Sequence, residues 1–253
     1  MKEIKKWLDE KLHLYHQADF ILKDPVSIPH RFTQIQDIEI AGFFAATIAW
    51  GNRTTILNNA LRLLQLMDHA PYSFIRQHQD SDLKRFLGFA HRTFNATDLL
   101  YFIQFLQHHY SHHDSLETAF VPDTNNSDEH VGNALQYFHQ YFFSLEHPQR
   151  TRKHIATPAK NAACKRLNMY LRWMVRKDEQ GIDFGLWNRL HSHQLIIPLD
   201  VHVARVSCRI GLLEYETSNW KNAVILTNKL KQMDADDPVK YDYALFGMGV
   251  LEG

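Results

Sequence analysis

The sequence predicts an all-α protein of about ten helices. Apolar residues recur three and four positions apart along most of the chain, whereas no convincing series of alternating strand residues is present. The chain has 253 residues, of which 45% are hydrophobic and 12% aromatic. It is therefore long enough and apolar enough to bury a substantial core, and its composition argues against disorder.

Proline, glycine and capping residues divide the first half of the chain into elements. An opening helix around 4–15 is followed by a region that Pro25 and Pro29 end. The remaining expected elements are an apolar helix over 38–50, a second helix through 56–64 after Gly51-Asn52, a helix over 98–110, and a short helix that a capping box at 114–117 opens. Residues 122–127 are expected to form a loop or linker.

The second half of the chain continues the helical pattern. We expect an aromatic helix over 133–145, a polar irregular stretch over 149–161, and helices over 162–176, 183–190, 200–210 and 218–230. Gly211 closes the helix over 200–210 as a C-terminal glycine. A last helix begins at Pro238, with Asp237 as its N-cap.

Charge and cysteine content exclude several classes of protein. Lys plus Arg and Asp plus Glu each number 28, so a nucleic-acid binder would need a local basic patch. Cys164 and Cys208 are too few for a disulfide framework, a four-cysteine zinc site or a four-cysteine iron–sulfur cluster. No signal peptide and no apolar run of about 20 residues is found, so we expect a cytoplasmic protein without a membrane partner. The 17 His are interpreted as scattered surface residues.

The helix over 162–176 is strongly amphipathic. At 100° per residue, Lys165, Arg172 and Arg176 fall within an arc of about 40°, opposite an apolar face. This pattern is compatible with a solvated basic face. It is also compatible with a cationic row that faces an anionic ligand such as a phosphate backbone.

Asp200 stands at the expected start of a helix, after Pro198 and Leu199. An Asp at this position accepts backbone N–H groups and stabilises the helix by about 1 kcal/mol. The same hydrogen bonds hold the carboxylate rigidly, which suits it to stabilising a positive charge that develops nearby. The two roles are compatible.

The run from Pro198 to Val206, PLDVHVARV, resembles the segment that carries the catalytic Asp in helix-hairpin-helix DNA glycosylases, the superfamily of endonuclease III and the 8-oxoguanine glycosylases. Three other regions follow the order of that superfamily: the turn Thr47–Thr54, the helix start at Lys165, and the segment Tyr241–Gly247. The resemblance covers residues 38–250, with the Asp200 string as its specific part. The whole sequence also resembles an uncharacterised bacterial family of unknown function, which would be a distant member of the superfamily.

The sequence departs from the superfamily at the hairpin. A glycine turn is expected just before the lysine, but Thr157–Ala162 contains no glycine. The interval from Lys165 to Asp200 is 200 − 165 = 35 residues, which is similar to the layout of the archaeal 8-oxoguanine glycosylases. Lys160 is a rival to Lys165 as the nucleophile.

The resemblance implies a fold, a reaction and a set of site residues. The fold would be one glycosylase-like unit over 1–253, with two helical subdomains that flank a cleft: residues 30–150, and residues 1–29 plus 151–253 with the catalytic pair. The reaction would be excision of a damaged DNA base, with Schiff-base lyase activity on oxidised purines. Lys165 and Asp200 would be catalytic; Trp50, Asn52 and Arg53 would contact or replace the extruded base; Lys153, Arg172, Arg176 and His202 would contact phosphates. No metal or cofactor is implied, and a monomer is expected.

Three other functions remain open from the sequence. The missing glycine hairpin and the zero net charge are compatible with a non-catalytic nucleic-acid binder on a degenerate glycosylase scaffold. The pair His113-Asp114, with His91, His109 and Asp98, would suit a metal-dependent phosphohydrolase of the all-helical His-Asp type. A helical domain for protein interaction is the third possibility. The Trp50 and Asn52 positions likewise have structural interpretations, as a core tryptophan and a turn asparagine.

Overall fold

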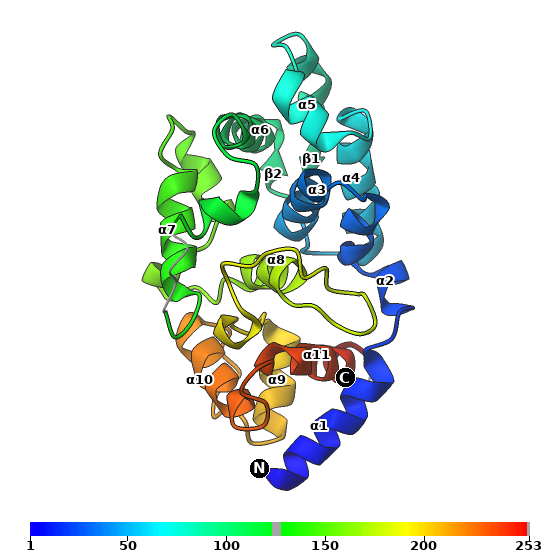
Figure 1. Ribbon diagram of the computed structural model, residues 1–253, viewed down its shortest axis with the longest axis vertical. Coiled ribbons are helices and arrows are strands. Elements are labelled where there is room, and N and C mark those ends of the chain that lie inside the picture. The colour runs from blue at the N-terminus through cyan, green and yellow to red at the C-terminus, as the bar shows by residue number, and fades with distance from the viewer. Residues whose placement is uncertain (123–127, 252–253) are drawn as a thin grey trace. The chain divides into compact units, whose positions relative to one another are not determined.

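The computed structural model describes residues 1–122 and 128–251, and it confirms the all-α prediction (Figure 1). Within these ranges the strands are two, each of two residues, and they pair in antiparallel fashion. Ala90 pairs with Asn95 and His91 with Phe94. The α-helices are α1 Lys2–Tyr15, α2 Phe20–Lys23, α3 Ile35–Thr47, α4 Arg53–Leu66, α5 Pro71–Gln77, α6 Ala96–Tyr110, α7 Gly132–Phe142, α8 Lys165–Val175, α9 Val201–Arg209, α10 Trp220–Lys231 and α11 Asp242–Leu251. The strands are β1 Ala90–His91 and β2 Phe94–Asn95. In the part of the chain that is described, no helix has the length and hydropathy needed to cross a membrane.

The chain forms two compact units. Unit 1 comprises residues 1–22, 125–136 and 156–253, and unit 2 comprises 23–124 and 137–155. The expected pair Lys165 and Asp200 belongs to unit 1. The segment 125–136, of which 128–136 are described, belongs to unit 1, although it lies within the range 30–150 predicted for the other subdomain.

Unit 2 is built around the apolar helix α3, which packs against α4 and α5, while α5 packs against α6. Its core is aromatic: Phe43 of α3 stacks on Phe102 of α6 at 5.5 Å between ring centroids, and Phe142 lies 4.7 Å from Phe102. The helix α6 opens with a capping box in which Asn95 and Asp98 accept each other's backbone N–H groups. These contacts make unit 2 a closed helical core.

Unit 1 is organised by α11, which packs against both α1 and α9 (Figure 1). Two glycines on α11 permit this packing. A Cβ on Gly247 would lie 2.5 Å from Cγ of Tyr15, and one on Gly249 would lie 2.9 Å from Cβ of His202. Any larger side chain at either position would therefore push α1 or α9 away from α11.

The prediction of a helix over 183–190 is wrong. Gly185 has a positive φ of 61°, which ends any helical path there. The backbone N–H of Phe184 donates to the carbonyl of Trp173 at 2.8 Å, and that of Leu186 donates to Met174 at 2.7 Å. The segment therefore satisfies carbonyl groups at the end of α8, which a free helix end would leave unpaired.

Two other helix starts differ from the prediction. The segment after Asp237 begins as a 3-10 turn, Pro238–Tyr241, and only then continues into α11. Asp237 makes no capping hydrogen bond there, because its carboxylate binds Arg176 instead. The predicted capping box at 114–117 is a 3-10 turn, Leu116–Ala119, that Ser115 caps. In the predicted linker over 122–127, residues 123–127 lie outside the described residues.

Candidate active site

Asp200 is the N-cap of α9, as the sequence predicts. Its Oδ1 accepts the backbone N–H groups of His202 and Val203, each at 2.9 Å. Both hydrogen bonds are made to one oxygen, so Oδ2 is not used by the cap. Asp200 therefore has a structural role through one oxygen and is available for chemistry through the other.

Lys165 is the first residue of α8, and its Nζ lies 3.6 Å from Oδ2 of Asp200. The Nζ also lies 5.9 Å from the centre of the Phe246 ring on α11. The two side chains are 28% and 19% exposed, so the pair is partly shielded but can be reached from solvent. The structure thus brings together the two residues that the sequence assigned to catalysis, at the starts of two helices.

The segment before Lys165 contains two residues with a left-handed backbone, and neither of them is a glycine. It consists of the 3-10 helix Pro158–Lys160, followed by Asn161 with φ 53° and Cys164 with φ 51°. Asparagine is the residue that best replaces glycine in this left-handed region. The Asn161 carbonyl accepts the N–H of Trp220 at 3.1 Å, and its side-chain oxygen accepts that of Lys221 at 3.2 Å. The start of α10 therefore holds the turn in place.

Lys160, the rival nucleophile, is exposed on this turn. The lysine in contact with Asp200 is Lys165. Cys164, which directly precedes Lys165, is buried, and its thiol lies 3.2 Å from the carbonyl oxygen of Ala162. Burial raises the pKa of the Cys164 thiol to about 12, so this cysteine is an inert structural residue.

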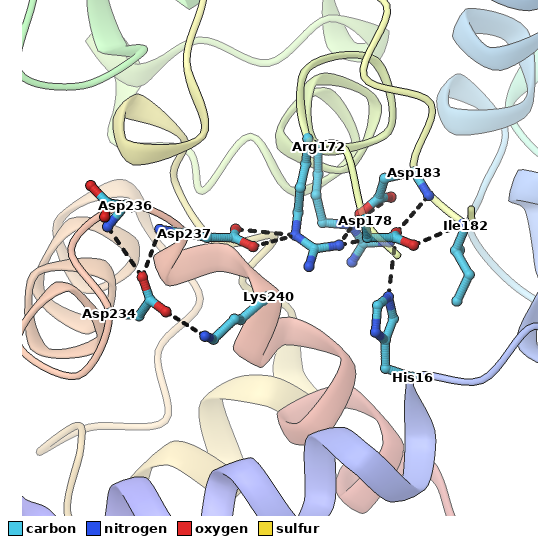
Figure 2. A network of polar contacts seen from close by, with 10 residues as sticks. His16, Arg172, Asp178, Ile182, Asp183, Asp234, Asp236, Asp237 and Lys240 are labelled. Atoms are coloured by element: carbon cyan, nitrogen blue, oxygen red, sulfur yellow. Dashed lines mark hydrogen bonds and ion pairs between the residues drawn. The ribbon is translucent and has the colours of Figure 1, made fainter. Parts of the chain in front are cut away.

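The prediction of a displayed cationic row is wrong for Arg172 and Arg176. The two residues are only 4% and 5% exposed, and they bind carboxylates (Figure 2). Arg172 donates to Asp242 and, at 3.3 Å, to Asp183. An ion-paired, buried guanidinium does not neutralise a phosphate, so these two arginines are unsuited to the role expected for them.

Arg176 binds three carboxylates, two from the segment that follows α8 and one from the residues before α11. Its Nε donates to Asp237 at 2.8 Å, and its Nη1 lies 3.1 Å from Asp178 and 2.9 Å from Asp183. Figure 2 shows Asp178 and Asp237 directed into this network from different parts of the chain. The arginines therefore join α8 to the segment after it and to the residues before α11.

Asp178 is held as an anion by several donors in this network. Although burial raises its pKa, His16, the backbone N–H groups of Asp183 and Ile182, and Arg176 together hold the pKa well below its usual range. Nε2 of His16, just after α1, lies 3.3 Å from Oδ2 of Asp178 (Figure 2). The network thus reaches all the way to the N-terminal helix.

Asp242 is a residue of the site that the sequence analysis missed. It is the first residue of α11 and is 5% exposed. Burial raises the pKa of its carboxyl group to about 6, against the lowering effect of Arg172, while Asp200 raises it further and Lys165 lowers it. An acidic residue inside the apolar string Tyr241–Gly247 was the available signal, because an Asp flanked by core residues is rarely buried without a partner.

His202 follows Asp200 on α9 and is half-buried. Its Nδ1 lies 3.5 Å from Nη2 of Arg205, and its backbone N–H is one of the two donors to Asp200. Its assignment as a phosphate contact stays a prediction.

Trp50, Asn52, Arg53 and Lys153 belong to unit 2. Asn52 is the N-cap of α4, because its side-chain oxygen accepts the N–H of Thr55 at 3.1 Å. Trp50 is half-buried, and the guanidinium of Arg92 lies 5.3 Å from the centre of its ring. Asn52, interpreted from the sequence as a turn asparagine, thus has a structural role at the start of α4, and the roles of these residues at a base stay predictions.

The ligand set for a His-Asp phosphohydrolase is not assembled. Asp98 accepts the hydroxyl of Thr151 at 2.9 Å and lies 3.2 Å from Nε2 of His154. His109 lies 2.9 Å from the carbonyl oxygen of Ser115, and burial lowers its pKa to about 4. Over residues 1–122 and 128–251, no three His, Cys, Asp or Glu side chains are arranged to hold a metal ion. The proposed combination of His91, His109, His113, Asp98 and Asp114 is therefore wrong.

Comparison with known proteins gives one match. The family described as "Protein of unknown function (DUF2400)" matches residues 24–251, and therefore nearly the whole chain, including Lys165, Asp200 and Asp242. No curated protein and no solved structure matches the chain. The protein belongs to the DUF2400 family.

Proposed function

We propose that this protein is a DNA glycosylase of the helix-hairpin-helix superfamily that removes an oxidised purine and forms a Schiff base through Lys165. The observation that carries the proposal is the 3.6 Å contact between Nζ of Lys165 and Oδ2 of Asp200. An amine nucleophile beside a fixed carboxylate is the arrangement that this chemistry requires. The superfamily layout of two helical subdomains is part of the proposal and rests on the sequence resemblance.

In the proposed reaction, Lys165 attacks C1′ of the sugar as a neutral amine. A C–N bond forms to Nζ, the bond from C1′ to the base breaks, and the base leaves with the bonding electron pair and a proton. Asp200, whose Oδ1 is fixed by two N–H groups, stabilises the positive charge that develops on the sugar. Opening of the sugar ring then gives the imine.

The turn at 157–164 supports the assignment of Lys165. In the superfamily a glycine hairpin precedes the lysine; here Asn161 and Cys164 take the left-handed backbone conformation that glycine would take. In the proposal, this segment takes the place of the glycine hairpin. Among the residues expected at phosphates, the proposal retains Lys153 and His202 and drops the buried Arg172 and Arg176.

The test is base release from duplex DNA that carries one oxidised purine, with 8-oxoguanine as the first probe. We expect release by the wild-type protein and a loss of about 100-fold or more in Asp200→Asn, since one preorganised charge is worth this much at a developing cation. Lys160→Gln is the matched control, because it removes an exposed lysine of the same turn; its rate should equal that of the wild type. Release that is unchanged in Asp200→Asn would contradict the proposal.

A second function, non-catalytic DNA binding on a degenerate glycosylase scaffold, is favoured by one observation: residues 157–162, just before Lys165, contain no glycine. A binder of this kind would bind DNA in a salt-dependent manner, would release no base from any duplex, and would bind equally well as Asp200→Asn.

A further inference from the structure

Asp242 also binds Arg172, and one of its two carboxylate oxygens is left without a hydrogen bond. One oxygen, Oδ2, accepts Nη1 of Arg172. The other, Oδ1, is buried and has no hydrogen-bond partner in the described part of the chain. A buried carboxylate oxygen without a donor is costly, and a proton on that oxygen removes the cost.

The position of Asp242 relative to Lys165 follows from two contacts between α8 and α11. Lys165 and Arg172 lie seven residues apart, two turns along one face of α8. Asp242 and Phe246 lie four residues apart, one turn along one face of α11. Arg172 contacts the first residue of that α11 pair, and Nζ of Lys165 lies 5.9 Å from the ring of the second. The Asp242 carboxylate therefore lies on the face of α11 that meets Lys165 and Arg172, at the Arg172 end of that face.

The charges around Asp242 do not balance when all groups are ionised. Two guanidinium groups, of Arg172 and Arg176, face the four carboxylates of Asp178, Asp183, Asp237 and Asp242. Asp183 and Asp237 have both oxygens bonded to guanidinium groups, and Asp178 is stabilised by His16 and two backbone N–H groups. Of the four carboxylates, Asp242 has a buried oxygen that accepts no hydrogen bond, so a proton is expected on Asp242.

The charged groups that act on Asp242 come from α8, from the segment after it and from the start of α9. Arg172 and Lys165 lie on α8, Asp183 lies in the segment after α8, and Asp200 lies at the start of α9. Asp183 and Asp200 disfavour the ionised form of Asp242, and Arg172 and Lys165 favour it. Asp242 and Lys165 are thus coupled, since each charge changes the free energy of the other.

We propose that Asp242 is a positioning residue of the Lys165–Asp200 site, which holds an exchangeable proton on Oδ1 and thereby sets the number of negative charges beside Lys165. When Oδ1 is protonated, one negative charge fewer surrounds the amine. This role rests on the proposed function, in which Lys165 acts as a nucleophile.

The test follows the amine itself and uses no DNA. Lysine labelled with ¹³C at Cε is incorporated into the full chain, and the Lys165 resonance is assigned from its loss in Lys165→Arg. As pH is varied, we expect an inflection in the Lys165 shift at about pH 6, the value for Asp242. The inflection should be lost in Asp242→Asn and retained in Asp183→Asn. Asp183 is the matched control, because it is also a buried carboxylate bound to Arg172, but both of its oxygens accept hydrogen bonds.

A wild-type curve without this inflection would overturn the proposal, and so would an inflection that persists in Asp242→Asn. The wild-type curve decides the question even when a variant fails to fold. An inflection that behaves as expected in a protein that releases no base would contradict the proposed function alone.

Discussion

The two carboxylate oxygens of Asp200 have different partners, and one of the oxygens faces Lys165. Oδ1 caps α9 through the N–H groups of His202 and Val203, whereas Oδ2 lies 3.6 Å from Nζ of Lys165. The two helix starts that carry these residues are thereby linked by a single side chain. This division allows the structural and chemical roles to be separated by substitution.

Asp200→Asn and Asp200→Ala should differ in stability. Asn keeps an oxygen that accepts the two N–H groups, so the free energy of unfolding should fall by less than about 0.5 kcal/mol; Ala removes the cap and should cost about 1–2 kcal/mol. Urea denaturation measures both values. Equal losses in the two variants would mean that the cap contributes nothing to folding.

Arg172→Gln should destabilise the protein strongly, by about 3–5 kcal/mol, because Asp183 and Asp242 would lose a buried cation. Arg209→Gln, at an exposed position on α9, should stay within about 0.5 kcal/mol of the wild type. Thermal unfolding of the two variants gives the comparison. A folded, fully stable Arg172→Gln would show that the network in Figure 2 does not stabilise unit 1.

Substitution at Asn161 tests the turn without glycine. Asn161 has φ 53°, so Asn161→Ala should lose about 1–2 kcal/mol through left-handed strain and through the lost bond to Lys221 N–H. Asn161→Gly loses the same hydrogen bond but removes the strain, and it should be more stable than the Ala variant by about 1 kcal/mol. If chemical denaturation showed Asn161→Ala to be more stable than Asn161→Gly, a left-handed residue at this position would be contradicted.

The protonation of Asp242 predicts a pH dependence of stability. Its pKa is raised in the folded protein from an ordinary value of 3.8 to about 6, so the folded state binds the proton more tightly. The resulting stabilisation is fully present below about pH 4 and is lost as the pH rises through about pH 6. The free energy of unfolding of the wild type, relative to Asp242→Asn, should therefore fall by roughly 3 kcal/mol over this range. A difference that is independent of pH would mean that Asp242 titrates normally.

The helix class and the Asp200 turn could be predicted from the sequence because both depend on local chemistry. Periodic apolar residues and an Asp before a helix act within a few positions of the chain. The environment of Arg172 and Arg176 could not be predicted in this way. Helical periodicity places them on one face of α8, but it does not reveal that Asp183, Asp237 and Asp242, far along the chain, cover that face.

The segment 183–190 illustrates the same limit. Its composition favours a helix, yet its N–H groups bond to the carbonyls of Trp173 and Met174, and Gly185 takes a positive φ. Tertiary hydrogen bonds thus override local propensity. The role of Asp242 could not be predicted for a related reason. Whether its Oδ1 and Oδ2 find donors depends on which side chains of other segments, such as Arg172 of α8, meet the start of α11.

The central claim is that Lys165 is the nucleophile, and borohydride trapping tests it most directly. The protein is incubated with duplexes that each carry one oxidised purine or one abasic site, borohydride reduces any imine to a stable amine, and the modified peptide is identified by mass spectrometry. The account predicts a covalent DNA adduct on Lys165 that is absent in Lys165→Gln and present in Lys160→Gln. An adduct on Lys160, or no adduct with any duplex in the set, would contradict it.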